Sequence, residues 1–275
     1  MSDVRTLPAL PALPARKAWL DTVRGLFVVL MAVYHSAYIA VMTGLATLDL
    51  WHGFWWWFPR FIASGFLFLS GYSLSVAAAR KSETLWPWLW RRSAKLALCA
   101  LAVSVVSALA LGRSWVFFGI LHCMALGAIV LGPFLKRPGA ALALGVLVLA
   151  AGLVLGRQRF DFWFLAWLGF RPQGVYPADY LPLLPWCAWM FFGAALGGQS
   201  PRVRGQSPGG ALAGRGQSPG EALGEGQTPG EALGEGQTPS LRPLAWLGRH
   251  SLGVYLVHLP ALFGLCSLIA WLVLV

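Results

Sequence analysis

Two ionisable side chains in the first long apolar stretch of the chain have a spacing suited to chemistry inside a helix. Arg24 and His35 are eleven residues apart, which at about 100° per residue returns them to within roughly 20° of one helix face. They are then separated by roughly 16 Å along the axis, about half a bilayer. Asp21 lies on the same side and can pair with Arg24. Ionisable groups inside a membrane span are costly, so we expect a functional site, or a His35 that is merely hydrogen-bonded to a neighbouring helix.

The composition is that of a membrane protein that crosses the bilayer several times. Hydrophobic residues make up 57% of the 275 residues and charged residues 11%, and the mean hydropathy is +0.65. The pI near 10.2 does not indicate nucleic-acid binding, because basic residues gather at the ends of the apolar stretches. The cysteines lack metal-ligand spacing, so we expect core residues and no bound metal. They are Cys99, Cys123, Cys187 and Cys266.

We predict an all-α, polytopic transmembrane helical bundle with about seven spans. Apolar stretches of suitable length lie near 19–42, 55–79, 92–111, 115–135, 140–155, 180–196 and 251–274. A further apolar segment, 160–170, is too short to span and is expected to lie at the interface or to re-enter. Lys and Arg are concentrated before the first span and in every second loop after it, which predicts a cytoplasmic N-terminus.

Outside the spans we expect two unstructured segments. The four predicted parts of the chain are a Pro-rich cytoplasmic tail (1–18), the first six spans (19–198), a cytoplasmic loop (199–243) and the last span (244–275). The loop carries a short repeat in which Pro208, Pro219, Pro229 and Pro239 recur. Repeats this short and this rich in Pro and Gly cannot bury a core, so the loop is predicted to be disordered.

Basic side chains at the start of the third span could hold phosphate groups. Arg91, Arg92 and Lys95 lie about one helical turn apart on the predicted cytoplasmic side. Arginine binds phosphate through a bidentate fork and lysine as a point charge. The plain alternative is an ordinary positively charged flank of a membrane span.

Further polar groups lie in the later spans. His122 is about 10 Å in from the outer surface, Asp179 is at the outer mouth of the sixth span, and His258 lies about two turns deeper than the interfacial His250. In the second span, small residues recur at steps of three and four. They either let another helix approach closely or leave room for a ligand chain.

Six short patterns occur in order along the chain. They are Asp21-x2-Arg24-Gly25 with Tyr34-His35, Phe66-Leu-Phe-Leu-Ser-Gly71, Arg91-Arg92 with Lys95-Leu, Phe118-Gly-Ile-Leu-His122, Asp179-Tyr-x-Pro-Leu-Leu-Pro-Trp186, and Leu247-Gly-Arg-His-Ser-Leu with Tyr-Leu-Val-His258. Together they resemble the bacterial branch of the heparan-alpha-glucosaminide N-acetyltransferase catalytic-domain family. The resemblance covers nearly the whole chain except the tail and the repeat loop. The spacing of Arg24 and His35 is also similar to the signature of the family-three membrane O-acyltransferases, where that histidine is considered catalytic.

Two positions depart from the family pattern. One characterised member of this family is a lysosomal enzyme, whose proposed catalytic histidine lies in the first loop on the non-cytoplasmic side. In the present chain only His52 is near the corresponding position. The last pattern usually reads His-Gln-Pro, whereas this chain has His258-Leu-Pro. Both departures concern the acceptor chemistry rather than the fold.

The resemblance implies a membrane-embedded acyltransferase that moves an acetyl group from cytosolic acetyl-CoA to an amino-sugar or hydroxyl acceptor at or beyond the membrane. His35 would act as the general base, or form a covalent acetyl intermediate, and His122 and Asp179 would orient it or the acceptor. The donor would bind through Arg24, Arg91, Arg92 and Lys95. Supporting positions would be Asp21, Gly65, Gly71, Arg249, His250 and His258, with the pantetheine arm passing small residues such as Gly65 and Gly71.

Two other classes of function also fit parts of the sequence. Histidine, arginine and aspartate inside helices also suit a proton-coupled transporter or flippase, which would not need the cationic cluster to bind coenzyme A. A non-catalytic membrane partner is the third possibility, suggested only by the repeat loop. For an acyltransferase we expect membrane lipid, coenzyme A and a carbohydrate-type acceptor as partners, no nucleic acid, and a possible homodimer in a bacterial plasma membrane.

Overall fold

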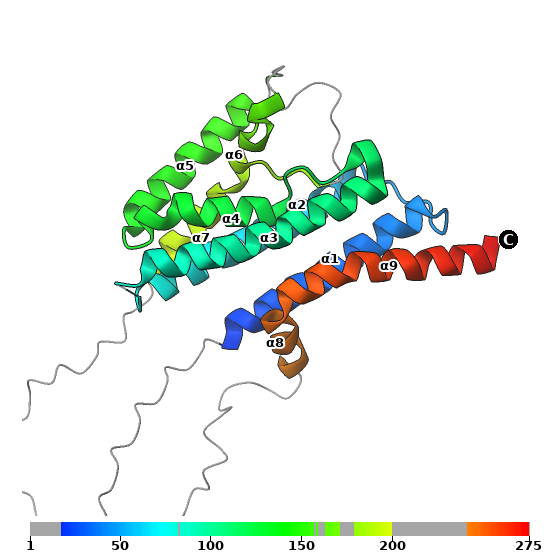
Figure 1. Cartoon of the computed structure of the whole chain (residues 1–275), viewed down its shortest axis with the longest axis horizontal. Coiled ribbons are helices and arrows are strands. Elements are labelled where there is room, and N and C mark those ends of the chain that lie inside the picture. The colour runs from blue at the N-terminus through cyan, green and yellow to red at the C-terminus, as the bar shows by residue number, and fades with distance from the viewer. Residues whose placement is uncertain are drawn as a thin grey trace, which may run out of the picture.

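The computed structural model describes residues 18–81, 83–156, 158, 163–170, 179–199 and 241–274. The α-helices are α1 (Ala18–Met42), α2 (Gly53–Ala78), α3 (Leu85–Leu111), α4 (Ile120–Leu131), α5 (Pro138–Leu155), α6 (Leu183–Trp186), α7 (Ala188–Gly198), α8 (Arg242–Arg249) and α9 (Ser251–Leu274). Short 3₁₀ turns are η1 (Gly112–Ser114), η2 (Gly132–Phe134) and η3 (Trp163–Leu168). The described residues form an all-α bundle, as predicted (Figure 1). Almost all of the predicted Pro-rich tail and of the repeat loop lies outside them, and Ala18 of the tail begins α1.

Five described helices are long and apolar enough to cross a membrane, and they coincide with five of the seven predicted spans. They are Trp19–Met42, Gly53–Ala78, Leu85–Ser114, Pro138–Leu155 and Ser251–Leu272. The other two predicted spans correspond to shorter apolar helices, Ile120–Phe134 and Leu183–Gly198. The predicted 160–170 segment contains η3, and its first residues lie outside the described part.

Local hydrogen bonds explain why the helix in the predicted span 115–135, α4, begins only at Ile120. The Ser104 hydroxyl donates to the Val116 carbonyl at 2.6 Å, and the Val116 N–H donates to the Ser107 hydroxyl at 2.9 Å. The backbone of Val116 is therefore bonded to side chains of α3 instead of to a helical turn. The predicted span 180–196 is divided into α6 and α7: Pro182 precedes α6, and Pro185 lies inside it.

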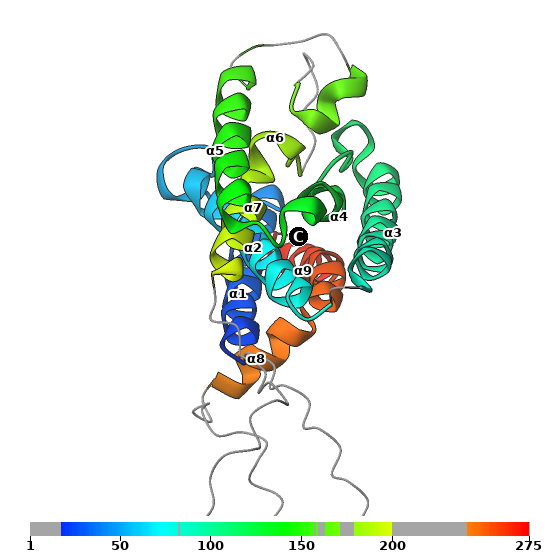
Figure 2. The same cartoon turned by 90° about the vertical axis from the view of Figure 1, so that its left-hand side faces the viewer.

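The helices form two groups, and the long helices α1, α2, α3 and α9 run in roughly the same direction (Figure 1). Helices α1 and α9 pack together, and α8 crosses α1 at the end of the bundle where α1 begins (Figure 1). Helices α2, α7, α5 and α4 form the larger group, and α3 packs on α4. Figure 2, which looks along the bundle, shows α2 between α1 and the α4 and α7 region. The core is richest there, with Leu67, Leu74, Leu131, Met190 and Phe191 almost fully buried.

Glycines allow two helix crossings in which backbones touch. A Cβ atom on Gly71 of α2 would lie 1.9 Å from the Met190 carbonyl oxygen of α7, and one on Gly193 would lie 2.0 Å from the Phe68 carbonyl oxygen. In α8, a Cβ on Gly248 would lie 1.7 Å from the carbonyl oxygen of Asp21. Only small residues permit such contacts, which are a common means of helix association in membranes.

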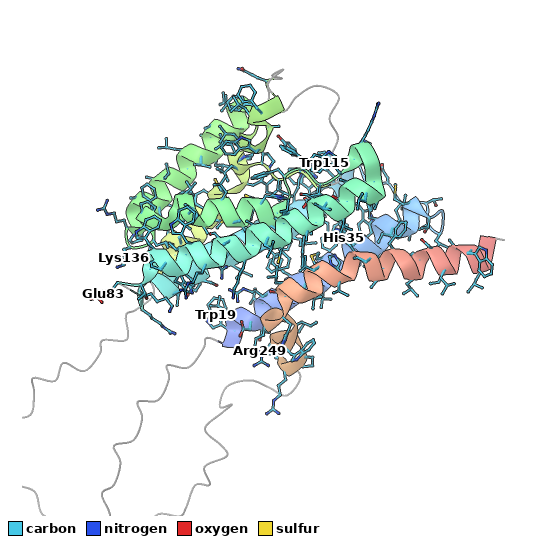
Figure 3. The ribbon with its side chains drawn as sticks, in the orientation of Figure 1. Trp19, His35, Glu83, Trp115, Lys136 and Arg249 are labelled. Carbon is cyan, nitrogen blue, oxygen red and sulfur yellow. The ribbon has the colours of Figure 1, made fainter. Side chains whose placement is uncertain are left out.

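The short helix α8 is absent from the sequence-based interpretation, which assigns 244–275 to the last span. Pro243 occupies the first turn of α8, where its missing N–H costs no hydrogen bond. Ala245 and Gly248 are buried against α1, whereas Arg242 and Arg249 are exposed. Figure 3 shows Trp19, Glu83, Lys136 and Arg249 toward one end of the bundle, with His35 and Trp115 farther along toward the other.

Candidate active site: a cationic cavity and a histidine pair

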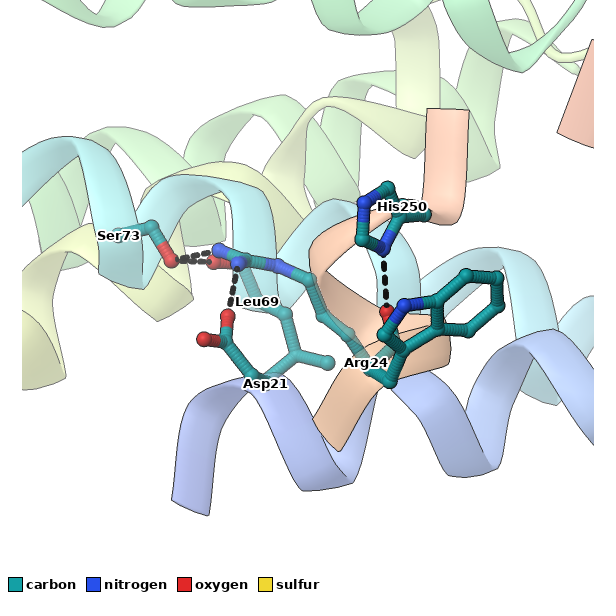
Figure 4. Close-up of polar contacts among 6 residues, drawn as sticks. Asp21, Arg24, Leu69, Ser73 and His250 are labelled. Carbon is teal, nitrogen blue, oxygen red and sulfur yellow. Dashed lines mark hydrogen bonds and ion pairs between the residues drawn. The ribbon is translucent and has the colours of Figure 1, made fainter. Parts of the chain in front are cut away.

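Arg24 is held between α1 and α2 by two polar partners. Its guanidinium donates to the Asp21 carboxylate at 3.3 Å and to the Ser73 hydroxyl of α2 (Figure 4). The Ser73 hydroxyl in turn donates to the Leu69 carbonyl at 2.7 Å, which leaves its lone pairs for Arg24. The predicted pairing of Arg24 with Asp21 is therefore present, and it fixes the direction of the arginine. His250 lies on the other side of the same close-up, with Nδ1 2.9 Å from the Trp246 carbonyl oxygen.

A cavity of about 530 Å³ opens beside Arg24, within the range of roughly 300–1,000 Å³ typical of ligand pockets. Five basic side chains from three helices line it: Arg24, Arg91, Arg92, Lys95 and Arg249. The structure thus brings together all four residues predicted to bind the donor and adds Arg249. Among the described residues that line the cavity, none is acidic. Such a concentration of positive charge suits an anionic ligand.

Arg92 has one buried nitrogen atom, Nε, without a hydrogen-bond partner among the described residues. One terminal nitrogen lies 3.5 Å from the Ser70 hydroxyl, at the limit of a hydrogen bond, and the guanidinium carbon lies 6.0 Å from the centre of the Trp88 ring. A shielded donor on a charged group is costly unless something accepts from it. An anionic group in the cavity would supply the missing acceptor.

His35 meets a second histidine at the α1–α9 contact. Its Nδ1 atom lies 3.2 Å from Nε2 of His258, and the ring centres are 4.9 Å apart. His258 is buried, with 8% of its surface exposed. Tyr255, one turn earlier on α9, lines the cationic cavity, and its ring centre is 5.7 Å from that of His258. The cavity and the histidine pair are therefore adjacent.

His122 and Asp179 lie together at a different place, the N-terminus of α4. The Gly119 N–H donates to His122 Nδ1 at 3.2 Å, and His122 Nε2 is 3.4 Å from the Ser104 hydroxyl. The Ile120 N–H donates to the Asp179 carboxylate at 3.2 Å. Both residues thus satisfy free N–H groups at the start of a helix. The structure records no contact between either of them and His35 in the described residues, so it gives no support to the prediction that they orient His35.

One family model, described as "Heparan-alpha-glucosaminide N-acetyltransferase, catalytic", matches residues 16–208. That is more than half of the chain. The chain belongs to this family. No curated protein and no solved structure gives a significant match to it. Family membership and the apolar helices together identify an integral membrane protein of acetyltransferase type.

The match to the heparan-alpha-glucosaminide N-acetyltransferase family covers α1 to α7 and ends before α8 and α9. It therefore includes Arg24, His35, Arg91 and Arg92, whereas His258 lies outside it. The structure nevertheless places α9 against α1, so a helix beyond the matched region contributes residues to the candidate site.

Among the cavity-lining residues to which the sequence analysis assigned no role are Ser70, Trp88 and Tyr255. A signal was present for Trp88, which precedes Arg92 by four residues and so shares its helix face. Another was present for Tyr255, which lies one turn before His258. Neither was recognised, because aromatic residues are also common at membrane interfaces.

The two glycines predicted to border the pantetheine arm have another role in the structure. A Cβ on Gly65 would lie 2.1 Å from the Phe27 ring, and Gly71 abuts the backbone of Met190. Both faces are filled by packed neighbours. The structure thus favours the packing alternative over a ligand channel between Gly65 and Gly71.

His52, the histidine nearest the first outer loop of the family pattern, is exposed in the α1–α2 connection. Its Nδ1 lies 2.8 Å from the Asp49 carboxylate. This hydrogen bond, together with one from the Trp51 N–H, lowers the pKa of Asp49 below its ordinary value. His52 and Asp49 do not line the cationic cavity.

Proposed function

We propose that the chain is a transmembrane acetyltransferase that takes an acetyl group from cytosolic acetyl-CoA and transfers it to an amine or hydroxyl of an amino-sugar acceptor at or beyond the membrane. The observation that carries this proposal is the cavity of about 530 Å³ lined by five basic side chains in a chain of this family. Neither a purely structural membrane helix bundle nor an ordinary charged flank needs cations that converge on one cavity.

The phosphates of coenzyme A supply the anionic groups that this cavity needs. Arg92, whose Nε is shielded and unpartnered within the described chain, would donate to one of them, and Arg91 and Lys95 lie on the same stretch of α3. Arg249 reaches the cavity from α8. Arginine forks and a lysine point charge together match several phosphate oxygens at once.

The acyl chemistry would take place near His35. The rise from Arg24 to His35 along α1 is roughly 16 Å, a distance that the extended pantetheine arm would bridge. The acceptor nitrogen or oxygen attacks the thioester carbonyl carbon, the C–S bond breaks, and the thiolate leaves with the coenzyme. His35 takes the proton that the acceptor loses and so acts as the general base.

Equilibrium binding of acetyl-CoA to the purified full chain tests the donor assignment without knowledge of the acceptor. We expect micromolar, saturable binding that Arg91→Ala/Arg92→Ala weakens tenfold or more, equal to about 1.4 kcal/mol. The matched control is Arg80→Ala/Arg137→Ala, which removes two exposed cations that do not line the cavity. Absence of binding by the folded wild type would reject the donor assignment and favour the transporter alternative.

A turnover assay then tests the role of His35. We expect thiol release from acetyl-CoA, with D-glucosamine as the probe acceptor, to fall at least a hundredfold in His35→Ala, because general-base catalysis contributes roughly 10²–10⁴ in rate. The affinity for acetyl-CoA should stay unchanged. Turnover of His35→Ala at the wild-type rate would remove His35 from the mechanism.

A further inference from the structure

The hydrogen-bond partners of His258 determine which of its ring nitrogens carries the hydrogen. Its Nδ1 lies 2.7 Å from the Tyr255 carbonyl oxygen and 3.2 Å from the Val254 carbonyl oxygen. A carbonyl oxygen only accepts hydrogen bonds, so Nδ1 must be the donor. In a neutral imidazole the other nitrogen then carries a lone pair. Nε2 of His258 is therefore an acceptor, and it points at His35.

The same reasoning applies to His35. Its Nδ1 lies 3.0 Å from the Met31 carbonyl oxygen and 3.2 Å from Nε2 of His258. Both neighbours accept, so Nδ1 of His35 carries the hydrogen and shares it between them. The lone pair is left on Nε2, for which the described residues supply no hydrogen-bond partner. The opposite tautomer would set the lone pair of Nδ1 against two acceptors, and burial strengthens that repulsion.

We propose that His258 is a positioning residue for His35. It accepts from Nδ1–H of His35 and thereby holds His35 in the tautomer whose Nε2 lone pair is free to take a proton. This inference rests on the proposed function, in which His35 is the general base. When Nε2 takes the acceptor proton, His35 becomes an imidazolium whose Nδ1–H still donates to Met31 and His258, while His258 itself stays neutral.

The geometry explains how α9 contributes to the candidate site, although the region that matches the family ends before α9 begins. His258 is buried, and it belongs to the helix that also supplies Tyr255 to the cationic cavity. A histidine whose second nitrogen is fixed by another group is the usual arrangement for imidazoles that act as bases or ligands. In this chain the second group is another imidazole, itself fixed by backbone carbonyls.

Two substitutions separate a positioning role from simple packing. His258→Gln keeps a side-chain oxygen that can accept from His35, whereas His258→Phe keeps the ring shape and removes the acceptor. We expect His258→Phe to lower kcat for D-glucosamine acetylation tenfold or more and His258→Gln to stay within about threefold of wild type, both with an unchanged acetyl-CoA Kd. A packing role predicts the reverse order, because phenylalanine fits the apolar site better than glutamine, and that result would overturn the proposal.

A spectroscopic readout tests the tautomer without any acceptor. The chain has five histidines, so ¹⁵N-histidine labelling gives few ring signals, and His35→Gln identifies those of His35. We expect the Nδ1–H tautomer of His35 in wild type and in His258→Gln, and a larger share of the Nε2–H tautomer in His258→Phe. A protonated Nε2 in a wild type that binds acetyl-CoA would refute this inference alone. Loss of donor binding with the expected tautomer would instead refute the proposed function.

Discussion

Arg92→Met should have opposite effects on the protein with and without its donor. The substitution keeps a long side chain but removes a charged group whose Nε is shielded and unpartnered within the described residues. Without a ligand that group is a cost to the fold, because an unpaired buried donor loses its hydration. With acetyl-CoA bound, the same group would gain an oxygen partner. We therefore expect a variant that melts no lower than wild type on its own and responds poorly to acetyl-CoA.

The sizes of both effects follow from the surroundings of Arg92. Replacing buried ions by apolar groups raises the free energy of unfolding by about 0–4 kcal/mol. Because Arg92 is only half-buried, we expect an increase of about 0–1 kcal/mol for Arg92→Met. That corresponds to an increase in Tm of up to about 4 °C. One lost hydrogen bond to a charged group costs about 2 kcal/mol, which weakens Kd about 30-fold. At a ligand concentration about 100 times the wild-type Kd, ligand stabilisation falls from about 2.7 to about 0.9 kcal/mol.

Thermal unfolding of the purified protein, followed with and without acetyl-CoA, measures both effects in one experiment. Arg92→Lys, which keeps the charge but lacks Nε and the fork, should recover part of the ligand response. Arg137→Met removes an exposed cation that does not line the cavity and should leave both midpoints unchanged. The reasoning is refuted if Arg92→Met melts far below wild type and keeps the full acetyl-CoA response, since Arg92 would then stabilise the fold and not the ligand.

Two further predictions concern parts of the chain outside the cavity. Gly71→Ala should lower the free energy of unfolding by about 1–3 kcal/mol, because its Cβ would lie 1.9 Å from the Met190 carbonyl oxygen and the helices must separate. The control is Gly139→Ala, whose added Cβ would meet open space. Equal Tm values for the two variants would contradict the packing argument. The lowered pKa of Asp49 means that its contact with His52 is present at neutral pH and is lost as the pH falls through the folded pKa of Asp49. His52→Ala should return the pKa of Asp49 toward its ordinary value in a ¹³C NMR titration and leave acetyl-CoA binding unchanged; an unchanged Asp49 titration would show that the His52 contact is not its cause.

The helical class and most span positions were predictable because they depend on local properties of the chain. A run of about 20 apolar residues predicts a membrane helix whatever it packs against. The Asp21–Arg24 pair was likewise predictable, since residues three apart share a helix face. The late start of α4 was not, because it depends on hydrogen bonds between Val116 and two serines of α3.

In the candidate site, too, some features were predictable from the sequence and others depend on how the helices pack. Its cations were recognisable by type, and the clustering of three of them on α3 followed from helical spacing. Their convergence on one cavity with Arg24 and Arg249 required the positions of α1 and α8, which meet across Gly25 and Gly248. Neither glycine contact can be read from a single helix, because small residues permit close packing without naming the partner.

What the sequence determined by itself is the membrane-spanning helical class, the family and the kinds of side chain available for acyl transfer, because each of these depends on residue type and on spacing within one helix. What only the tertiary structure decided is which of those side chains meet. His122 and Asp179 were predicted to orient His35 or the acceptor, and the structure places His258, 223 residues away along the chain, against His35. Such a contact depends on which helix faces pack together, and side chains from α1 and α9 reach each other only after those helices have associated.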